Sequence, residues 1–230
     1  MQYTFAERPK IIMAQRVDAT PSPYYSSQRK DILSMLPDKY FAVLEIGCGL
    51  GNFRENLDCE HIYWGVEPNV EAANEASHKL DKVLVGTFKD VCRDIPNHHF
   101  DLVICCDVME HMVDHEEFLE LIKEKIKEGG CIVGSVPNVR FAQNLFNMIF
   151  RKDWEYTSSG ILDRTHLRFF TKKSVVRMLE KHNYSIERLE GLNGVTGSAL
   201  NLNRLRIYIF ILLFGADSRF LQYGFRIRER

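Results

Sequence analysis

The sequence predicts an α/β fold, a doubly wound and mostly parallel sheet of seven strands with a lid over one end. Three observations support this prediction. Short apolar segments recur along the first 140 residues, and stretches with helical periodicity separate them. A glycine-rich turn, 47–51, follows the first apolar segment, and acidic residues such as Glu67 and Asp107 end later ones. Apolar strands that alternate with helices are typical of a parallel sheet that helices cover on both faces.

Each apolar segment is a predicted strand. The first five strands are expected at 41–46, 62–66, 83–85, 100–106 and 131–136. The pattern changes after Pro137, and two further strands are expected at 184–189 and 222–228, the last of them antiparallel. Ligands of such sheets bind beyond the carboxyl ends of the strands, where the strand order reverses. The acidic residues at the strand ends therefore mark the expected site.

Helices are expected between and around these strands. The clearest helix begins after Asp114, a candidate cap, and is expected to stop at Gly129-Gly130. Apolar residues repeat along it at helical spacing, so it should cover the sheet. The helices are expected at 26–36, 114–127, 141–150 and 171–182.

The chain is expected to form one domain, 1–230, because neither an internal repeat nor a linker divides it. Its parts would be an N-terminal cap helix (1–37), a ligand-binding core (41–138), a lid (139–170) and the C-terminal part of the sheet (171–230). The composition, 45% hydrophobic and 27% charged, excludes a disordered or collagen-like chain. The net charge of −1, with no basic stripe outside the C-terminal tail, disfavours a nucleic-acid partner.

Cysteine usage and the N-terminus favour a cytoplasmic protein. The six cysteines show no CxxC spacing, and three of them lie inside apolar segments, so we expect reduced thiols. The first residues lack the apolar core of a signal peptide. The apolar segment 205–214 is too short to span a bilayer. We expect it to be buried in the domain rather than to lie on a membrane.

The turn after the first strand carries the main chemical signal. Glycines at 47, 49 and 51 allow positive φ and let a ligand approach the backbone. A dinucleotide fingerprint requires a glycine where Asn52 stands, and no lysine of a P-loop follows. Glu67 follows Gly47 by 20 residues, where a carboxylate can accept hydrogen bonds from ribose hydroxyls. The pattern predicts an adenosine-containing ligand without a pyrophosphate.

Five segments in this order resemble the class I S-adenosylmethionine-dependent methyltransferases, which have a Rossmann-like fold. The matching segments are VLEIGCGLG (43–51), YWGVEPN (63–69), VLVGTF (83–88), FDLVICCDVMEHM (100–112) and GGCIVGSVPN (129–138). The resemblance implies an enzyme with S-adenosylmethionine as its cofactor.

The resemblance also implies a role for each residue of the cofactor site. The glycine turn would pass around the methionine part of the cofactor, with Glu45 supporting the turn. Glu67 would hold the ribose, and Thr87 and Phe88 would flank the adenine. Asp107 and the carbonyl of Cys106 would lie near the amino group. The complete expected set is Tyr25, Arg29, Glu45, Gly47, Cys48, Gly49, Gly51, Glu67, Pro68, Thr87, Phe88, Cys106 and Asp107.

A narrower resemblance concerns the acceptor. Segments 24–37 and 136–171 are similar to methyltransferases of bacterial surface-polysaccharide and O-antigen biosynthesis. They imply O-methylation of a sugar or glycan-precursor hydroxyl, and a first helix that brings Tyr25 and Arg29 to the cofactor carboxylate. The sequence D-V-x-E-H at 107–111 instead resembles the ubiquinone-pathway O-methyltransferases. N-methylation of an amino sugar, O-methylation of a quinone-like phenol, and a catalytically silent cofactor-binding partner protein therefore stay open.

His166 and His111 are the candidate catalytic residues, because an imidazole can take the proton of an acceptor hydroxyl near neutral pH. Asp107, Glu110 and His111 could together hold Mg²⁺, and His115 follows His111 at a one-face helical spacing, but Asp114 is expected to start a helix between the two histidines. We therefore expect no metal, and Glu110 and His111 would instead shape the mouth of the pocket. An apolar stripe along 141–150 is expected to be core or a homodimer contact.

Overall fold

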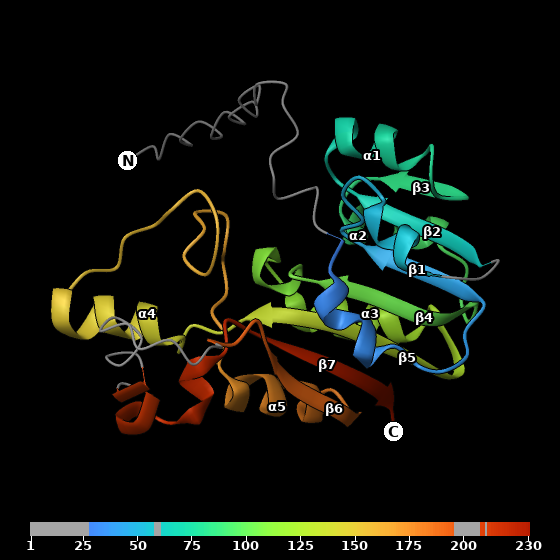
Figure 1. Ribbon diagram of the computed structural model, residues 1–230. Coiled ribbons are helices and arrows are strands. Elements are labelled where there is room, and N and C mark those ends of the chain that lie inside the picture. Colours follow the sequence, from blue (N-terminus) through green and yellow to red (C-terminus); the bar gives the residue numbers. More distant parts are fainter. Residues whose placement is uncertain (1–27, 58–60, 196–207, 210) are drawn as a thin grey trace, which may run out of the picture.

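The computed structural model of the protein describes residues 28–57, 61–195, 208–209 and 211–230 (Figure 1). In this part of the chain seven strands form one sheet, in the order β3-β2-β1-β4-β5-β7-β6. The first five strands pair in parallel, and β7 is antiparallel to both of its neighbours. The strands are β1 (Ala42–Ile46), β2 (Ile62–Glu67), β3 (Lys82–Val85), β4 (Phe100–Cys106), β5 (Ile126–Pro137), β6 (Tyr184–Leu192) and β7 (Gln222–Glu229).

The helices connect these strands and flank the sheet. The α-helices are α1 (Val70–Ala76), α2 (Phe88–Val91), α3 (His115–Lys123), α4 (Ala142–Phe146) and α5 (Lys172–Lys181). The shorter helices are η2 (Lys30–Met35), η3 (Asn52–Asn56), η4 (Cys92–Asp94), η5 (Met109–His111), η6 (Asn147–Arg151) and η7 (Ala216–Arg219), of which η6 is a π-helix and the others are 3₁₀. The side chains of Asn69, Asp114 and Thr171 accept backbone hydrogen bonds at the starts of α1, α3 and α5.

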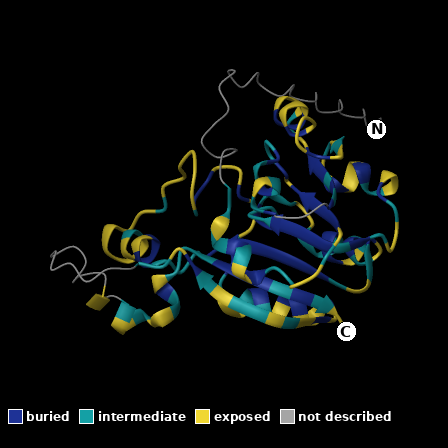
Figure 2. Ribbon diagram, turned by 45° about the vertical axis from the view of Figure 1, so that its right-hand side comes forward, coloured by how far each residue is buried: buried dark blue, intermediate teal, exposed yellow. Residues whose placement is uncertain are grey.

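The central strands of the sheet are covered on both faces, as the predicted doubly wound fold requires. Leu44 of β1 packs in a cluster with Phe118 of α3 and Leu179 of α5. The next residue back along the strand, Val43, packs in a second cluster with Ile32 of η2. Because successive side chains of a strand point to opposite faces, the two clusters are the two faces of the sheet. Accordingly, β1 is buried along its whole length and β4 along most of it (Figure 2).

The strand order reverses at β1, which lies between β2 and β4. The chain leaves β1 toward β2 on one side and later returns to β4 on the other, so the carboxyl ends of β1 and β4 open side by side. This is the position where ligands bind in open parallel sheets. The predicted glycine turn follows β1, and Asp107 follows β4.

The predicted stop at Gly129-Gly130 is wrong. Helix α3 ends at Lys123, and both glycines lie inside β5, which begins at Ile126. The register between β4 and β5 shifts between Phe100 and Leu102, and a Cβ at Gly130 would lie 3.0 Å from the carbonyl oxygen of Asp101. Gly130 therefore serves a close approach of two strands, and Gly129 supplies a positive φ of 76°; sequence alone does not distinguish this pair from a helix end.

The C-terminal apolar segment is largely exposed, which corrects the expectation that it is buried. Ile211 and Phe214 pack against Ala142 and Leu145 of α4. The residues on the other side of this segment point away from α4, and Leu212 is 85% exposed. The two segments lie side by side at one end of the molecule in Figure 1. Residues 205–207 and 210 lie outside the described residues. Among the residues that are described, no helix has the length and hydropathy needed to cross a membrane.

Candidate active site

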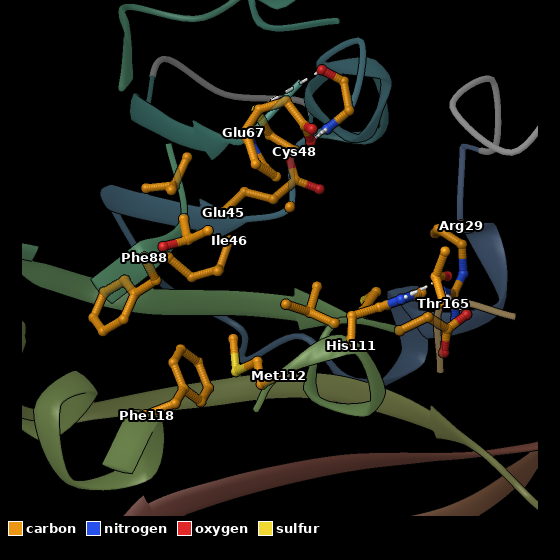
Figure 3. Close-up of a pocket in the computed structure, with 18 of the residues that line it drawn as sticks. Arg29, Glu45, Ile46, Cys48, Glu67, Phe88, His111, Met112, Phe118 and Thr165 are labelled. Carbon is orange, nitrogen blue, oxygen red and sulfur yellow. Dashed lines mark hydrogen bonds and ion pairs between the residues drawn. The ribbon is translucent and has the colours of Figure 1, made fainter. Parts of the chain in front are cut away.

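A cavity of about 1560 Å³ opens at the carboxyl edge of β1, β2 and β4. Figure 3 shows its two ends: Phe88 and Phe118 lie at one end, and Arg29 and Thr165 lie at the other. Segments predicted as cap and lid contribute to its wall. Its lining includes Arg29, Lys30 and Asp31 from the first segment, and Ser158, Asp163, Arg164 and Thr165 from the second.

The glycine turn is held in a conformation that favours glycine. Gly47, Gly49 and Gly51 have φ of 73°, 52° and 72°. The backbone N–H groups of Gly47 and Cys48 donate to the carbonyl oxygen of Val66 at 2.8 and 3.1 Å, which ties the turn to β2. A Cβ at Gly47 would lie 2.8 Å from the side chain of Val108. The turn is thus a fixed backbone wall at the centre of the cavity.

Glu67 both braces this turn and faces the cavity. One carboxylate oxygen accepts from the N–H of Gly49 and the other from the N–H of Asn69, each at 2.9 Å. The side chain is buried, and burial raises its pKa, although the two backbone donors oppose this effect. A carboxylate oxygen has more than one acceptor site, so both oxygens can also receive ribose hydroxyls. The geometry fits the role expected of Glu67.

Glu45 lies deeper in the same wall. Its carboxylate accepts from the hydroxyl of Tyr63 at 2.9 Å, and burial raises its pKa to about 8. The turn was expected to be supported by Glu45, but its Gly49 N–H donates to the carboxylate of Glu67 instead. Glu45 lines the cavity beside Cys48, a free thiol.

Aromatic rings close the end of the cavity where adenine is expected. The rings of Phe88 and Phe118 meet edge to face with centroids 5.1 Å apart. Thr87 begins α2, and its hydroxyl and N–H both donate to Asp90, at 2.5 and 3.1 Å. Its side chain is therefore already engaged as a helix cap, and Gly86 and Pro68 complete this part of the wall. Phe118 appears in the sequence only as one apolar residue of a helix.

Arg29 and Asp107 form a charged cluster on the other side of the glycine turn. A nitrogen of the Arg29 guanidinium lies 2.8 Å from Asp107. Ser135 donates to Asp107 at 2.7 Å and accepts from Arg29 at 2.9 Å, and Gln222 donates to Asp107 as well. Asp107 has a φ of 54°, so its backbone turns sharply at the end of β4. Ser135 and Gln222, which come from β5 and β7, were not predicted as part of the site.

Two expected cofactor residues remain, Cys106 and Tyr25. Cys106 lines the cavity beside Asp107, and burial raises the pKa of its thiol to about 12, so the thiol stays protonated. Tyr25 lies outside the described residues.

The two candidate catalytic histidines lie together. Their rings meet edge to face with centroids 4.7 Å apart. His111 lines the cavity, and His166 lies behind it and is buried. Nδ1 of His166 lies 2.9 Å from the carbonyl oxygen of Ile161, and Nδ1 of His111 lies 3.1 Å from the hydroxyl of Thr165. Burial, followed by the neighbouring imidazole, lowers the pKa of His111.

Thr165 and Asp163 set the orientation of His111. The hydroxyl of Thr165 donates to Asp163 at 2.6 Å, so its oxygen accepts from Nδ1–H of His111. Partial burial would raise the pKa of Asp163, but the hydrogen bonds from Thr165 keep it below its usual value. Neither residue carries a signal in the sequence, because the contact between Thr165 and His111 spans 54 positions of the chain.

Glu110 fastens the lid segment to the core. Its carbonyl oxygen accepts from the N–H groups of Leu167 and Arg168 at 2.7 and 3.0 Å. Its side chain is fully buried, and neither carboxylate oxygen has a hydrogen-bond partner among the described residues. Burial raises its pKa well above the usual value.

Comparison with known protein families identifies the family of this chain. Residues 21–189 match the model of a family described as a methyltransferase domain. The chain belongs to this family. The match confirms the predicted enzyme class and S-adenosylmethionine as the cofactor, and the glycine turn, Glu67 and the aromatic end of the cavity fit that cofactor.

Relatives with assigned names include two bacterial proteins named ubiquinone biosynthesis O-methyltransferase. The protein from Rickettsia bellii is 28% identical over 162 residues, which are 65% of this chain and 64% of that protein. The protein from Vibrio atlanticus is 27% identical over 168 residues, covering 69% of this chain and 67% of that protein. The chain thus covers slightly less than two thirds of the Rickettsia protein.

Solved structures confirm the predicted fold. A possible histamine N-methyltransferase from Thermotoga maritima matches with a TM-score of 0.60 and 17% identity, over 90% of this chain and 89% of that chain. An S-adenosylmethionine-dependent methyltransferase from Archaeoglobus fulgidus matches with a TM-score of 0.55 and 21% identity, over 82% of this chain and 86% of that chain.

Proposed function

We propose that this protein transfers a methyl group from S-adenosylmethionine to a hydroxyl of a quinone-like phenol. The observation that carries this proposal is the similarity to the Rickettsia and Vibrio proteins named ubiquinone biosynthesis O-methyltransferase. It favours an acceptor that the sequence analysis left as an alternative. The sugar or glycan-precursor hydroxyl, its main expectation, becomes the competing acceptor.

The chain's own residues would hold the cofactor along the cavity. Glu67 would receive the ribose hydroxyls, and the edge-to-face pair of Phe88 and Phe118 would enclose the adenine. Arg29 and Asp107 would meet the charged groups of the methionine end. The bound cofactor supplies an electrophilic methyl group, so the protein has to align an acceptor oxygen with it and manage one proton.

His111 would meet the acceptor oxygen. It lines the cavity, whereas His166 supports it from behind. The lowered pKa keeps the imidazole neutral at neutral pH, and the bond to Thr165 places the remaining ring proton on Nδ1. Nε2 is then the basic nitrogen, which can accept a hydrogen bond from a hydroxyl. The geometry therefore supports His111 as the proton acceptor and His166 as the residue that positions it.

An acceptor panel tests this proposal. Purified protein with radiolabelled S-adenosylmethionine is given prenylated catechols, simple phenols, nucleotide sugars, amino sugars and glycan extracts. We expect label on a phenolic oxygen. Turnover restricted to sugars would overturn the proposal in favour of the competing acceptor. Cofactor binding without turnover of any acceptor would favour the silent partner protein.

A further inference from the structure

Glu45 has a carboxylate oxygen without a partner in the middle of the cofactor cavity. The side chain is only 7% exposed and forms part of the cavity wall. One oxygen accepts from the hydroxyl of Tyr63, and the other has no hydrogen-bond partner among the described residues. In Figure 3 Glu45 lies in the part of the cavity that also holds Cys48 and Glu67. Because a buried polar group without a partner is costly, this oxygen indicates that a ligand group lies against it.

The strand order aligns Glu45 with the middle of a bound cofactor. β1 lies between β2 and β4, so Glu45 lies between Glu67, which ends β2, and Asp107, which follows β4. Glu67 fits the ribose, and Arg29 and Asp107 fit the charged groups of the methionine end. The sulfonium is the covalent link between those two parts of the cofactor. In a cofactor bound this way, the sulfonium passes the end of β1, the strand that carries Glu45.

The surroundings of Glu45 favour its neutral form when no cation lies against it. Burial raises its pKa to about 8; the hydrogen bond from Tyr63 opposes this shift, the carboxylate of Glu67 adds to it, and the charge of Arg29 opposes it. The other titratable groups close to it are two thiols that burial keeps protonated, Cys48 and Cys106. Glu45 is therefore mostly protonated at neutral pH, and a cation beside it would favour loss of that proton.

We propose that Glu45 distinguishes S-adenosylmethionine from its demethylated product, S-adenosylhomocysteine, by charge. Glu45 gives its proton to solvent when the positively charged sulfonium binds, and it takes a proton back from solvent when a neutral thioether remains. The ion pair strengthens binding of the charged cofactor and gives no such gain to the product. Glu45 therefore favours exchange of product for fresh cofactor. This inference rests on the cofactor and not on the choice of acceptor.

The charge and proton balance of one turnover agrees with this role. In the transfer the carbon–sulfur bond breaks, the electron pair stays on sulfur, and the methyl group bonds to the acceptor oxygen. The proton of the acceptor hydroxyl leaves separately. The proton that Glu45 releases on cofactor binding is the one it recovers afterwards, so each turnover releases one proton in total.

Binding measurements without an acceptor test the inference. Calorimetry gives the dissociation constants of S-adenosylmethionine and S-adenosylhomocysteine from pH 6 to pH 8. Both ligands carry the same ribose, adenine, amino and carboxylate groups, so the ratio of their affinities isolates the sulfonium. The preference for S-adenosylmethionine should rise about 10-fold or more over this range, because deprotonation of Glu45 becomes easier as pH approaches 8. Titrations at pH 7 in buffers of different ionisation enthalpy should show about half a proton or more released with S-adenosylmethionine beyond that released with the product.

Variants of Glu45 and its neighbour assign the effect. Glu45→Gln keeps the shape of the side chain but does not ionise, so its affinity ratio should not change with pH; circular dichroism checks its fold. Tyr63→Phe removes a hydrogen bond to the carboxylate, so the rise should move to higher pH. Glu75→Gln, at an exposed glutamate of α1, is the matched control and should behave as the wild type. A pH-independent ratio in the wild-type protein, or a rise that persists in Glu45→Gln, overturns the inference.

Discussion

Removing the Glu67 carboxylate should weaken cofactor binding. In Glu67→Ala the ribose hydroxyls lose a buried, charged acceptor, and the N–H groups of Gly49 and Asn69 lose their partners. Hydrogen bonds to charged groups contribute about 1.5–3 kcal/mol, so affinity should fall about 10- to 150-fold. The two orphaned donors should also lower the melting temperature, because each unsatisfied buried group is destabilising.

Calorimetric titration with S-adenosylhomocysteine measures this loss. Glu71→Ala is the matched control, because Glu71 is an exposed glutamate of α1. Its affinity and melting temperature should equal those of the wild type. Glu67→Gln, which keeps one acceptor oxygen, should lie between the control and Glu67→Ala. Unchanged affinity in a folded Glu67→Ala variant would remove Glu67 from the ribose site and refute the reasoning from turn geometry.

Three further predictions concern the catalytic pair, the exposed segment and a buried acid. His111→Ala should lower the turnover number about 10²- to 10⁴-fold, the range for a positioned acid or base, while cofactor affinity is kept, and normal turnover of the folded variant would exclude His111 as the proton acceptor. Ile209→Asp, at a half-exposed position, should shift the urea midpoint less than Ile211→Asp, which faces α4; equal shifts would contradict the observed packing. Burial raises the folded-state pKa of Glu45 to about 8, so its protonated form stabilises the fold at low pH, and this contribution is lost as pH rises toward 8. Glu45→Gln should therefore gain stability relative to wild type between pH 5 and pH 8 in urea unfolding, and a pH-independent difference would contradict the shift.

Local sequence was enough to predict the parallel core. The apolar segments at β1, β2, β3 and β4 are strands within one or two residues of the expected ranges. The glycine turn after β1 and Glu67 at the end of β2 lie at the cavity, because strand ends and positive-φ turns are properties of a few consecutive residues. The cofactor class followed from the same short segments.

Contacts between distant segments could not be predicted. Gly129-Gly130 looks like a helix stop, yet the bulged pairing with β4 places it in a strand. The hydrophobicity of Leu212 is typical of a core residue. Only one side of its segment packs against α4, however, and Leu212 is exposed.

The sequence by itself determined the βαβ order, the glycine turn and the acid at the end of β2, and with them the cofactor. Only the tertiary structure determined which side chains meet at the end of the cavity where the acceptor is expected. It placed His166 against His111 and directed the buried side chain of Glu110 toward both, with the lid segment held by the backbone of Glu110. The physical reason is that a strand or turn is encoded by neighbouring residues, whereas a buried polar cluster forms only where packing brings distant segments together.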